Sequence, residues 1–196
     1  MLTKSSITIT QQKISGDPHV GKILLNQQQI KNKTKELAKQ ITIDYVDKNP
    51  LLIGILKGAG LFLSDLVRQI KIDLNIDYMA VSSYGASTKT SGIVRILKDL
   101  DEEISGRHVI IIEDIVDSGL TLSYLLKNLS SRKPVSLEIC SLLRKKGTQK
   151  LALDVKYLGF LIDDVFVVGY GLDYKQKHRN LKHVHILENA PKNNGH

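Results

Sequence analysis

The segment from Ile110 to Thr121 holds the residues whose types and spacing indicate chemistry most directly. Its sequence is I-I-I-E-D-I-V-D-S-G-L-T, a buried strand followed at once by three acids, a Ser, a Gly and a Thr. The spacing of an amphipathic helix follows in Leu122, Leu125, Leu126 and Leu129. In an open parallel sheet, ligands bind beyond the carboxyl ends of the strands, where the next helix presents unpaired amides to an anion. The turn is therefore predicted to hold a phosphorylated substrate.

The composition of this turn narrows the kind of phosphate ligand. It has neither the G-x-x-x-x-G-K-S/T pattern of a nucleoside-triphosphatase loop nor the G-x-G-x-x-G pattern of a dinucleotide site. The amides of residues 117 to 121 and the hydroxyls of Ser118 and Thr121 could surround one phosphate monoester. Glu113 and Asp114 would repel that phosphate unless they bind sugar hydroxyls or Mg²⁺, which prefers oxygen ligands. A phosphate, a neighbouring diol and Mg²⁺ together describe a ribose 5-phosphate group.

The run E-D-I-V-D-S-G-L-T resembles the phosphoribosyl pyrophosphate signature of the type I phosphoribosyltransferases. Four more segments, in the right order, resemble hypoxanthine-guanine phosphoribosyltransferase, so the resemblance extends from about Asn26 to Leu187. These segments are Leu56-Lys57-Gly58-Ala59, Ser82-Ser83-Tyr84-Gly85, Leu143-Arg144-Lys145-Lys146, and Val167 to Tyr174 with Arg179 close behind. Five collinear motifs are much more specific than one.

The resemblance implies an enzyme of purine salvage. It would transfer the 5-phosphoribosyl group from phosphoribosyl pyrophosphate to N9 of hypoxanthine and guanine, giving the nucleotide and pyrophosphate. The implied cofactor is Mg²⁺, with Glu113, Asp114 and, through water, Asp173 as its contacts. The implied assembly is a homodimer or a homotetramer.

The resemblance also assigns the residues that hold the sugar donor. The phosphoribosyl group is expected to contact Glu113, Asp114, Asp117, Ser118, Gly119, Leu120 and Thr121. Asp117 is the expected catalytic residue, because it would exchange a proton with N7 of the purine as N9 joins the sugar; the alternative is an N-cap for the following helix. Pyrophosphate is expected to contact Leu56, Lys57, Gly58, Ser83, Tyr84 and Arg179. In the family the Leu–Lys bond of the first of these segments is often cis.

The purine is expected to contact Ile115, Lys145, Phe166, Val167 and Asp173. A 6-oxopurine has a carbonyl at C6, so a Lys145 donor accepts it and rejects adenine, which has an amino group there. An unpaired buried donor is costly, which turns this contact into selectivity. Phe166 resembles the aromatic residue that stacks on the purine, and Val167 the backbone that meets its edge. Taken alone, Lys145 would be a solvated surface charge and Phe166 a core residue.

Apolar strands that alternate with amphipathic helices predict an α/β fold around a mostly parallel twisted sheet with helices on both faces. Strands are expected at residues 51–56, 76–84, 94–97, 107–113, 135–142, 155–160, 165–168 and 184–187. Helices are expected after Asn26, after Gly60 and at residues 121–129. The resemblance implies the type I phosphoribosyltransferase fold with a small hood subdomain and a flexible catalytic loop. The polar stretch 85–92 is expected to be that loop, which would close over the reacting centre.

The length and net charge of the chain limit its number of domains and its kinds of partner. The 196 residues suit one domain, expected at 19–190 between polar tails at 1–18 and 191–196. The net charge of +8 suits nucleic acid, a membrane surface or an anionic small substrate. Because Lys and Arg are spread over the chain, neither nucleic acid nor a membrane is an expected partner. No apolar stretch approaches a bilayer span and residues 1–12 lack a signal-peptide core, so a cytoplasmic location is expected.

Two other functions stay open. Some proteins with this fold sense phosphoribosyl pyrophosphate and bind RNA or DNA through a basic face. A pure sensor has less need of the set Lys145, Phe166, Asp173 and Tyr84, which argues against that role. The second alternative is a xanthine-preferring transferase, since segments 143–146 and 167–173 argue against adenine but do not exclude some use of xanthine.

Overall fold

Strands and helices alternate along much of the chain in the computed structural model, which describes residues 19–84, 93–150 and 153–188. The strands are β1 (Val20–Leu25), β2 (Leu51–Leu56), β3 (Asn75–Tyr84), β4 (Ile93–Lys98), β5 (His108–Val116), β6 (Ser136–Lys145), β7 (Tyr157–Ile162), β8 (Val167–Val168) and β9 (Val184–Leu187). The helices are α1 (Gln27–Asp44), α2 (Gly60–Val67) and α3 (Leu120–Ser130). The predicted α/β fold is confirmed.

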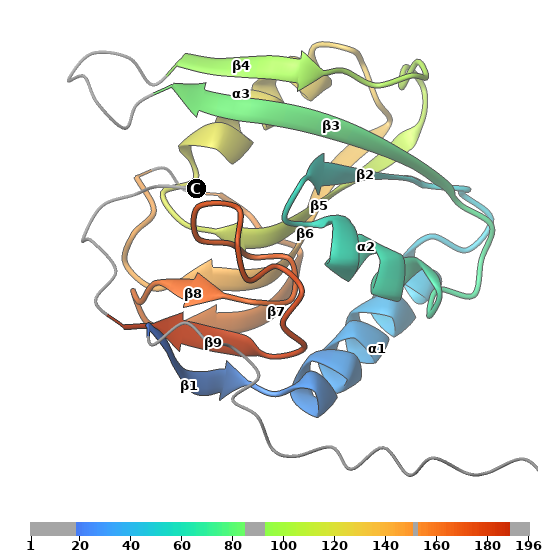
Figure 1. Cartoon of the computed structure of the whole chain (residues 1–196). Helices are drawn as coiled ribbons and strands as arrows, with labels where there is room; N and C mark the ends of the chain where they lie inside the picture. Colours follow the sequence, from blue (N-terminus) through green and yellow to red (C-terminus); the bar gives the residue numbers. More distant parts are fainter. Residues whose placement is uncertain (1–18, 85–92, 151–152, 189–196) are drawn as a thin grey trace, which may run out of the picture.

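The strands form two sheets (Figure 1). The larger has the order β4-β3-β2-β5-β6-β7, and each neighbouring pair is parallel except β3 and β4. The smaller sheet has the order β1-β9-β8 and is antiparallel. The mostly parallel sheet was predicted, and the small sheet corresponds to the predicted hood.

The two central strands of the large sheet are buried on both faces. Side chains of Leu52 and Ile110 pack in one cluster with residues of α1 and α2, whereas Leu51 and Ile111 pack in another with residues of α3. Neighbouring residues enter different clusters because successive side chains of a strand point to opposite faces. A strand covered on both faces has an unbroken apolar run, which explains the signal in the sequence.

Helix α1 begins at the predicted place. The Asn26 Oδ1 atom accepts a hydrogen bond from the Gln29 backbone N–H at 2.9 Å, and the Gln29 Oε1 atom accepts one from the Asn26 N–H at 2.8 Å. This reciprocal capping box satisfies two amides of the first turn. The helix then buries one face against the sheet through Ile30, Thr34, Leu37, Ala38 and Ile41.

Strand β5 corrects the expected place of two acids. The strand was predicted to end at Glu113 but continues to Val116, with Ile115 and Val116 paired in parallel to β6. Glu113 and Asp114 therefore lie within the strand, and the turn begins at Asp117. The apolar pair after the acids carries this signal, because it continues the buried strand beyond two polar residues.

Strand β1 was not predicted. Its sequence V-G-K-I-L-L lacks the regular alternation of a half-buried strand, and its pairing with β9 is interrupted by two register shifts. Contacts with β9, which is distant in the sequence, thus determine its conformation. The predicted tails and the predicted loop at 85–92 lie outside the described residues, and the domain limits 19–190 stay a prediction. None of the helices in the described part is long and apolar enough to cross a bilayer.

The buried carboxylate of Asp77 connects the beginning of β3 to the segment that follows β4. Asp77 is 6% exposed and accepts hydrogen bonds from the backbone N–H groups of Tyr78 at 2.6 Å and Asp101 at 2.8 Å. The Lys98 Nζ atom lies 3.4 Å from it. Burial opposes the negative charge, but these donors outweigh burial and hold the pKa of Asp77 below its usual value.

We expect Asp77→Asn to lower the free energy of unfolding by about 1–3 kcal/mol at about pH 7, because the amide cannot replace a carboxylate bound by several donors. A carboxyl whose pKa is lowered on folding stabilises the protein above its unfolded pKa, and this contribution disappears as pH falls through the folded pKa. Urea unfolding should therefore show a difference between the two proteins that shrinks below about pH 4.

The matched control is Asp101→Asn, because Asp101 is 77% exposed and also pairs with Lys98. An exposed pair contributes less than about 1 kcal/mol. An equal loss in both variants, or a loss that is independent of pH, would contradict the role given to Asp77.

Candidate active site

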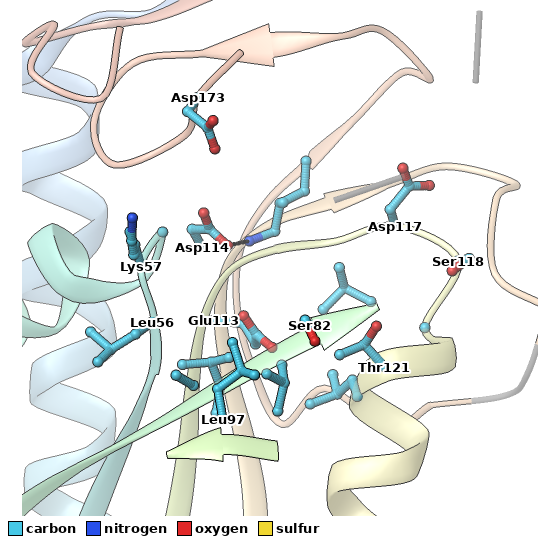
Figure 2. A pocket seen from close by; sticks show the side chains of 18 of the residues that line it. Leu56, Lys57, Ser82, Leu97, Glu113, Asp114, Asp117, Ser118, Thr121 and Asp173 are labelled. Atoms are coloured by element: carbon cyan, nitrogen blue, oxygen red, sulfur yellow. Dashed lines mark hydrogen bonds between the residues drawn. The ribbon is translucent and has the colours of Figure 1, made fainter. Parts of the chain in front are cut away.

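A cavity of about 460 Å³ lies at the carboxyl ends of β2, β3 and β5 (Figure 2). This volume is in the range of small-molecule sites. The predicted residues that line it are Leu56, Lys57, Gly58, Glu113, Asp114, Ile115, Asp117, Ser118, Gly119, Thr121, Asp173 and Arg179. The fold thus brings together residues 56–58, 113–121 and 173–179, which are distant in the sequence. They meet at the carboxyl ends of the strands, where a ligand was expected.

The predicted phosphate loop, residues 117–121, comprises the turn between β5 and α3 and the first two residues of α3. Gly119 is the N-cap of α3, and its φ of +78° lies in the left-handed region that favours glycine. The N-cap role considered for Asp117 is therefore wrong. Among the described residues no side chain caps this helix at its N-cap position, which leaves amides of the first turn available to an anion. The Leu120 side chain is exposed and does not line the cavity, so only its backbone could contact a ligand.

Glu113 and Asp114 occupy the floor of the cavity. In Figure 2, Glu113 points toward Ser82, and one Asp114 oxygen accepts a hydrogen bond from the Ile115 backbone N–H at 2.8 Å. Burial raises the pKa of Glu113 well above its usual value, and the charge of Asp114 adds to the rise. Burial also raises the pKa of Asp114 to about 6, although the Ile115 amide and Arg179 act in the opposite direction. Hydroxyl donors or a divalent cation would stabilise the charged forms of the two acids. The cavity has room for such ligands.

The turn after β2 packs against Asp114 with no space for a side chain. A Cβ on Gly58 would lie 1.7 Å from the Asp114 Oδ2 atom. A Cβ on Gly171, where φ is +100°, would lie 2.2 Å from the Gly58 carbonyl oxygen. The Leu56–Lys57 peptide bond is cis, as the resemblance suggested. Two glycines therefore let three backbone segments meet at one side of the cavity.

Asp173 and Arg179 bind each other in the loop after β8. Their Oδ1 and Nη2 atoms are 2.6 Å apart, and the second Asp173 oxygen accepts a hydrogen bond from the Gln176 N–H at 2.7 Å. The Gln176 Oε1 atom also accepts a hydrogen bond from the Lys57 Nζ atom at 3.2 Å. Gln176 lines the cavity but was not predicted, since a lone Gln in a loop carries no motif.

The carboxylates do not form a metal site on their own. Within residues 19–84, 93–150 and 153–188, no group of three or more His, Cys, Asp or Glu side chains could hold a metal ion. Glu113, Asp114 and Asp173 nevertheless all line the cavity. Mg²⁺ commonly takes one or two carboxylates, several waters and substrate phosphates. This donor set therefore fits an ion that is bound together with a polyphosphate.

Lys145 and Asp117 form a partly buried ion pair beside the cavity. The Lys145 Nζ atom lies 2.9 Å from the Asp117 Oδ2 atom and 3.2 Å from the Asp164 Oδ1 atom. Burial disfavours the charge of Lys145, but the hydrogen bonds and charges of Asp117 and Asp164 outweigh it and raise the pKa of Lys145. Lys145 is 7% exposed, so the interpretation as a solvated surface charge is wrong.

Among the described strands, β8 forms one edge of the small sheet. The Leu187 N–H donates to the Phe166 carbonyl at 2.8 Å, and Val167 is opposite Ile186. In this antiparallel arrangement the N–H and C=O groups of Val167 point away from β9. Because β8 is the last strand of its sheet, these groups face outward.

The remaining predicted residues lie around the cavity or beyond what the structure describes. Phe166 is half-buried and packs edge-on against Tyr174, with ring centroids 5.7 Å apart. Lys145, Phe166 and Val167 do not line the cavity itself. Ser83 and Tyr84 belong to β3, but their side chains lie outside the described part of the chain. Ser82, which was not assigned a role, lines the cavity, and its buried Oγ atom has no hydrogen-bond partner among the described residues.

Comparison with known proteins agrees with this geometry. A family model for the phosphoribosyl transferase domain matches residues 20–175. The hypoxanthine-guanine phosphoribosyltransferase of Mycobacterium avium is 50% identical over 172 residues, which are 85% of each chain. The enzyme of the same name from Bacillus subtilis is 47% identical over 171 residues, 87% of this chain and 95% of that one.

A solved structure gives the same result for the fold. The hypoxanthine phosphoribosyltransferase of Staphylococcus aureus superposes with a TM-score of 0.83 and 45% sequence identity, over 87% of this chain and 92% of that chain. A family model that matches most of the chain and relatives that cover most of its length identify the family. The chain belongs to the hypoxanthine-guanine phosphoribosyltransferases, within the type I phosphoribosyltransferases.

Proposed function

We propose how this chain, a hypoxanthine-guanine phosphoribosyltransferase of purine salvage, divides the reaction among its residues. It transfers the 5-phosphoribosyl group of phosphoribosyl pyrophosphate to N9 of hypoxanthine or guanine, giving the nucleotide and pyrophosphate. The contact between Lys145 and Asp117 carries this proposal, because it joins a donor for O6 of the base to an acceptor for its N7 proton.

The phosphate loop binds the 5-phosphate of the sugar donor. Its amides and the hydroxyls of Ser118 and Thr121 supply donors, and the N-terminus of α3 adds a favourable dipole. Glu113 and Asp114 accept hydrogen bonds from the ribose hydroxyls. The turn at residues 56–58, with Ser83, Tyr84 and Arg179, binds the pyrophosphate end.

Asp117 and Lys145 act on the base. Asp117 accepts the N7 proton as N9 forms a bond to C1′ and pyrophosphate departs. Loss of this proton raises the electron density on N9, the nitrogen that attacks the sugar. The Lys145 ammonium has three N–H donors, and two of them reach Asp117 and Asp164. The third donates to O6 of the base. Phe166 packs on the purine, and the outward backbone groups of Val167 bind its edge.

Glu113, Asp114 and, through water, Asp173 would hold Mg²⁺ beside the sugar donor. The ion would neutralise charge on the pyrophosphate group and fix the ribose hydroxyls. Arg179 is paired with Asp173 in the structure, so a pyrophosphate oxygen would compete with Asp173 for its guanidinium.

We further propose that the enzyme works in the cytoplasm as a homodimer or homotetramer, with small-molecule substrates and without a nucleic-acid or membrane partner. Its positive net charge of +8 favours a polyanionic sugar donor. A regulator that senses this sugar donor would bind it without forming a nucleotide from any base.

The direct test is a panel of bases supplied with phosphoribosyl pyrophosphate and Mg²⁺. We expect nucleotide formation from hypoxanthine and guanine, little from xanthine and none from adenine.

Lys145→Gln should lower kcat/KM for hypoxanthine by about 10²-fold and weaken discrimination against adenine. The reason is that a shorter, neutral amide replaces the ammonium donor to O6, and its carbonyl oxygen can accept a hydrogen bond from the amino group of adenine. The control is Lys146→Gln, because Lys146 is 55% exposed. Unchanged rejection of adenine in Lys145→Gln would remove Lys145 from base recognition.

Asp117→Asn should retain the fold and the affinity for phosphoribosyl pyrophosphate but lower kcat by about 10²–10⁴-fold, the usual contribution of general acid–base catalysis. Steady-state kinetics and calorimetric titration with the sugar donor separate these effects. Asp163→Asn is the control, since Asp163 pairs with Lys146 at the exposed surface. Wild-type turnover in Asp117→Asn would rule out the proton transfer.

Gly58→Ala should abolish most of the activity, because its Cβ would overlap with the Asp114 carboxylate and displace it. Gly60→Ala is a close control, because nothing lies within 4 Å of a Cβ at Gly60. Thermal unfolding of both variants checks that they fold. Equal activity in the two variants would show that the Asp114 position is not needed.

A further inference from the structure

The segment Thr148–Lys150 lies against the outer side of the phosphate loop. The Thr148 Oγ1 atom donates to the Asp117 carbonyl at 3.1 Å, and the Lys150 N–H donates to the Ser118 carbonyl at 3.0 Å. The Gln149 Nε2 atom lies 3.2 Å from the Asp117 carbonyl oxygen and 2.6 Å from the Lys145 carbonyl oxygen. None of these three residues lines the cavity.

These contacts determine where the amides of the loop point. In a planar trans peptide, the C=O of one residue and the N–H of the next point in opposite directions. Holding the Asp117 carbonyl from outside therefore turns the Ser118 N–H toward the cavity. Holding the Ser118 carbonyl does the same for the Gly119 N–H. Ser118 and Gly119 both line the cavity.

Gln149 also links the two residues that act on the base. The side chains of Lys145 and Asp117 are in contact at 2.9 Å, and the Gln149 amide bridges their carbonyls. A side-chain NH₂ group has two hydrogens, and besides the two carbonyls the Gln149 Nε2 atom lies 3.3 Å from the Thr148 Oγ1 atom. One amide thus joins the carboxyl end of β6 to the phosphate loop.

We propose that Gln149 is a positioning residue that directs the Ser118 amide of the phosphate loop at the 5-phosphate. The inference rests on the proposed function, because it takes residues 117–121 as the phosphate site. Gln149 is half-buried and does not line the cavity; it acts through the backbone of Asp117 and Lys145.

The test compares Gln149→Glu and Gln149→Met, both of similar length to Gln but without the NH₂ donor. We expect the affinity for ribose 5-phosphate, measured by calorimetry without a base, to fall about tenfold in both variants. The KM for phosphoribosyl pyrophosphate should rise by a similar factor, while kcat changes less than about threefold, because Asp117 is kept. The exposed Gln40→Glu on α1 is the control for the same chemical change.

Thermal unfolding separates positioning from simple stabilisation. If both Gln149 variants fold and bind ribose 5-phosphate as the wild type does, the inference is overturned, even if their melting temperatures fall. If Gln149→Glu does not fold, Gln149→Met gives the same decision without an added charge.

Thr121→Val separates this inference from the proposed function. Thr121 lines the cavity, and its hydroxyl is assigned to the 5-phosphate. Wild-type affinity for ribose 5-phosphate in Thr121→Val would show that the phosphate site lies elsewhere. Loss of affinity in Thr121→Val but not in the Gln149 variants would overturn the Gln149 inference alone.

Discussion

The ion pair between Lys145 and Asp117 connects the residue predicted to recognise the base with the residue predicted to transfer its proton. Lys145 is the last residue of β6, and Asp117 follows β5 directly, so the parallel pairing of these strands places both at one sheet edge. A buried ammonium without a partner would be very unfavourable, so the pair also stabilises the charge that the proposed base recognition needs. The position of each residue thus depends on the sheet and on the other residue.

Close backbone packing is the second constraint on the site. The turn after β2 and the loop after β8 approach so closely that glycine is required in both, and the Asp114 carboxylate lies against the first of them. Acidic groups crowded in this way have raised pKa values because burial and mutual repulsion disfavour their charges. The cavity is therefore organised for ligands that supply positive charge or hydroxyl hydrogens.

Much of this arrangement could be predicted from the sequence, and the exceptions have physical causes. The unbroken apolar runs of β2 and β5 and the helical spacing of the leucines in α3 gave clear signals, because the strands are buried on both faces and the helix on one. Strand β1 was missed because its pairing with the distant β9 determines it, and the end of β5 was missed because two acids interrupt its apolar run before Ile115 and Val116. The motifs indicated Asp117 and Lys145 separately but not their contact. Gln149 and Gln176 could not be predicted, because single polar residues in loops acquire a role only through tertiary contacts.

The edge position of β8 limits how mutation can change the proposed base recognition. Sheet edges bind a further strand through main-chain N–H and C=O groups, and the outward groups of Val167 have that orientation. A flat heterocycle held there would take the place of an added strand. Main-chain groups persist through nearly every substitution, with proline as the exception for the N–H. Under the proposed base recognition, mutation would therefore alter the preferred base mainly through side chains such as Lys145, while the main-chain contact at Val167 would stay constant.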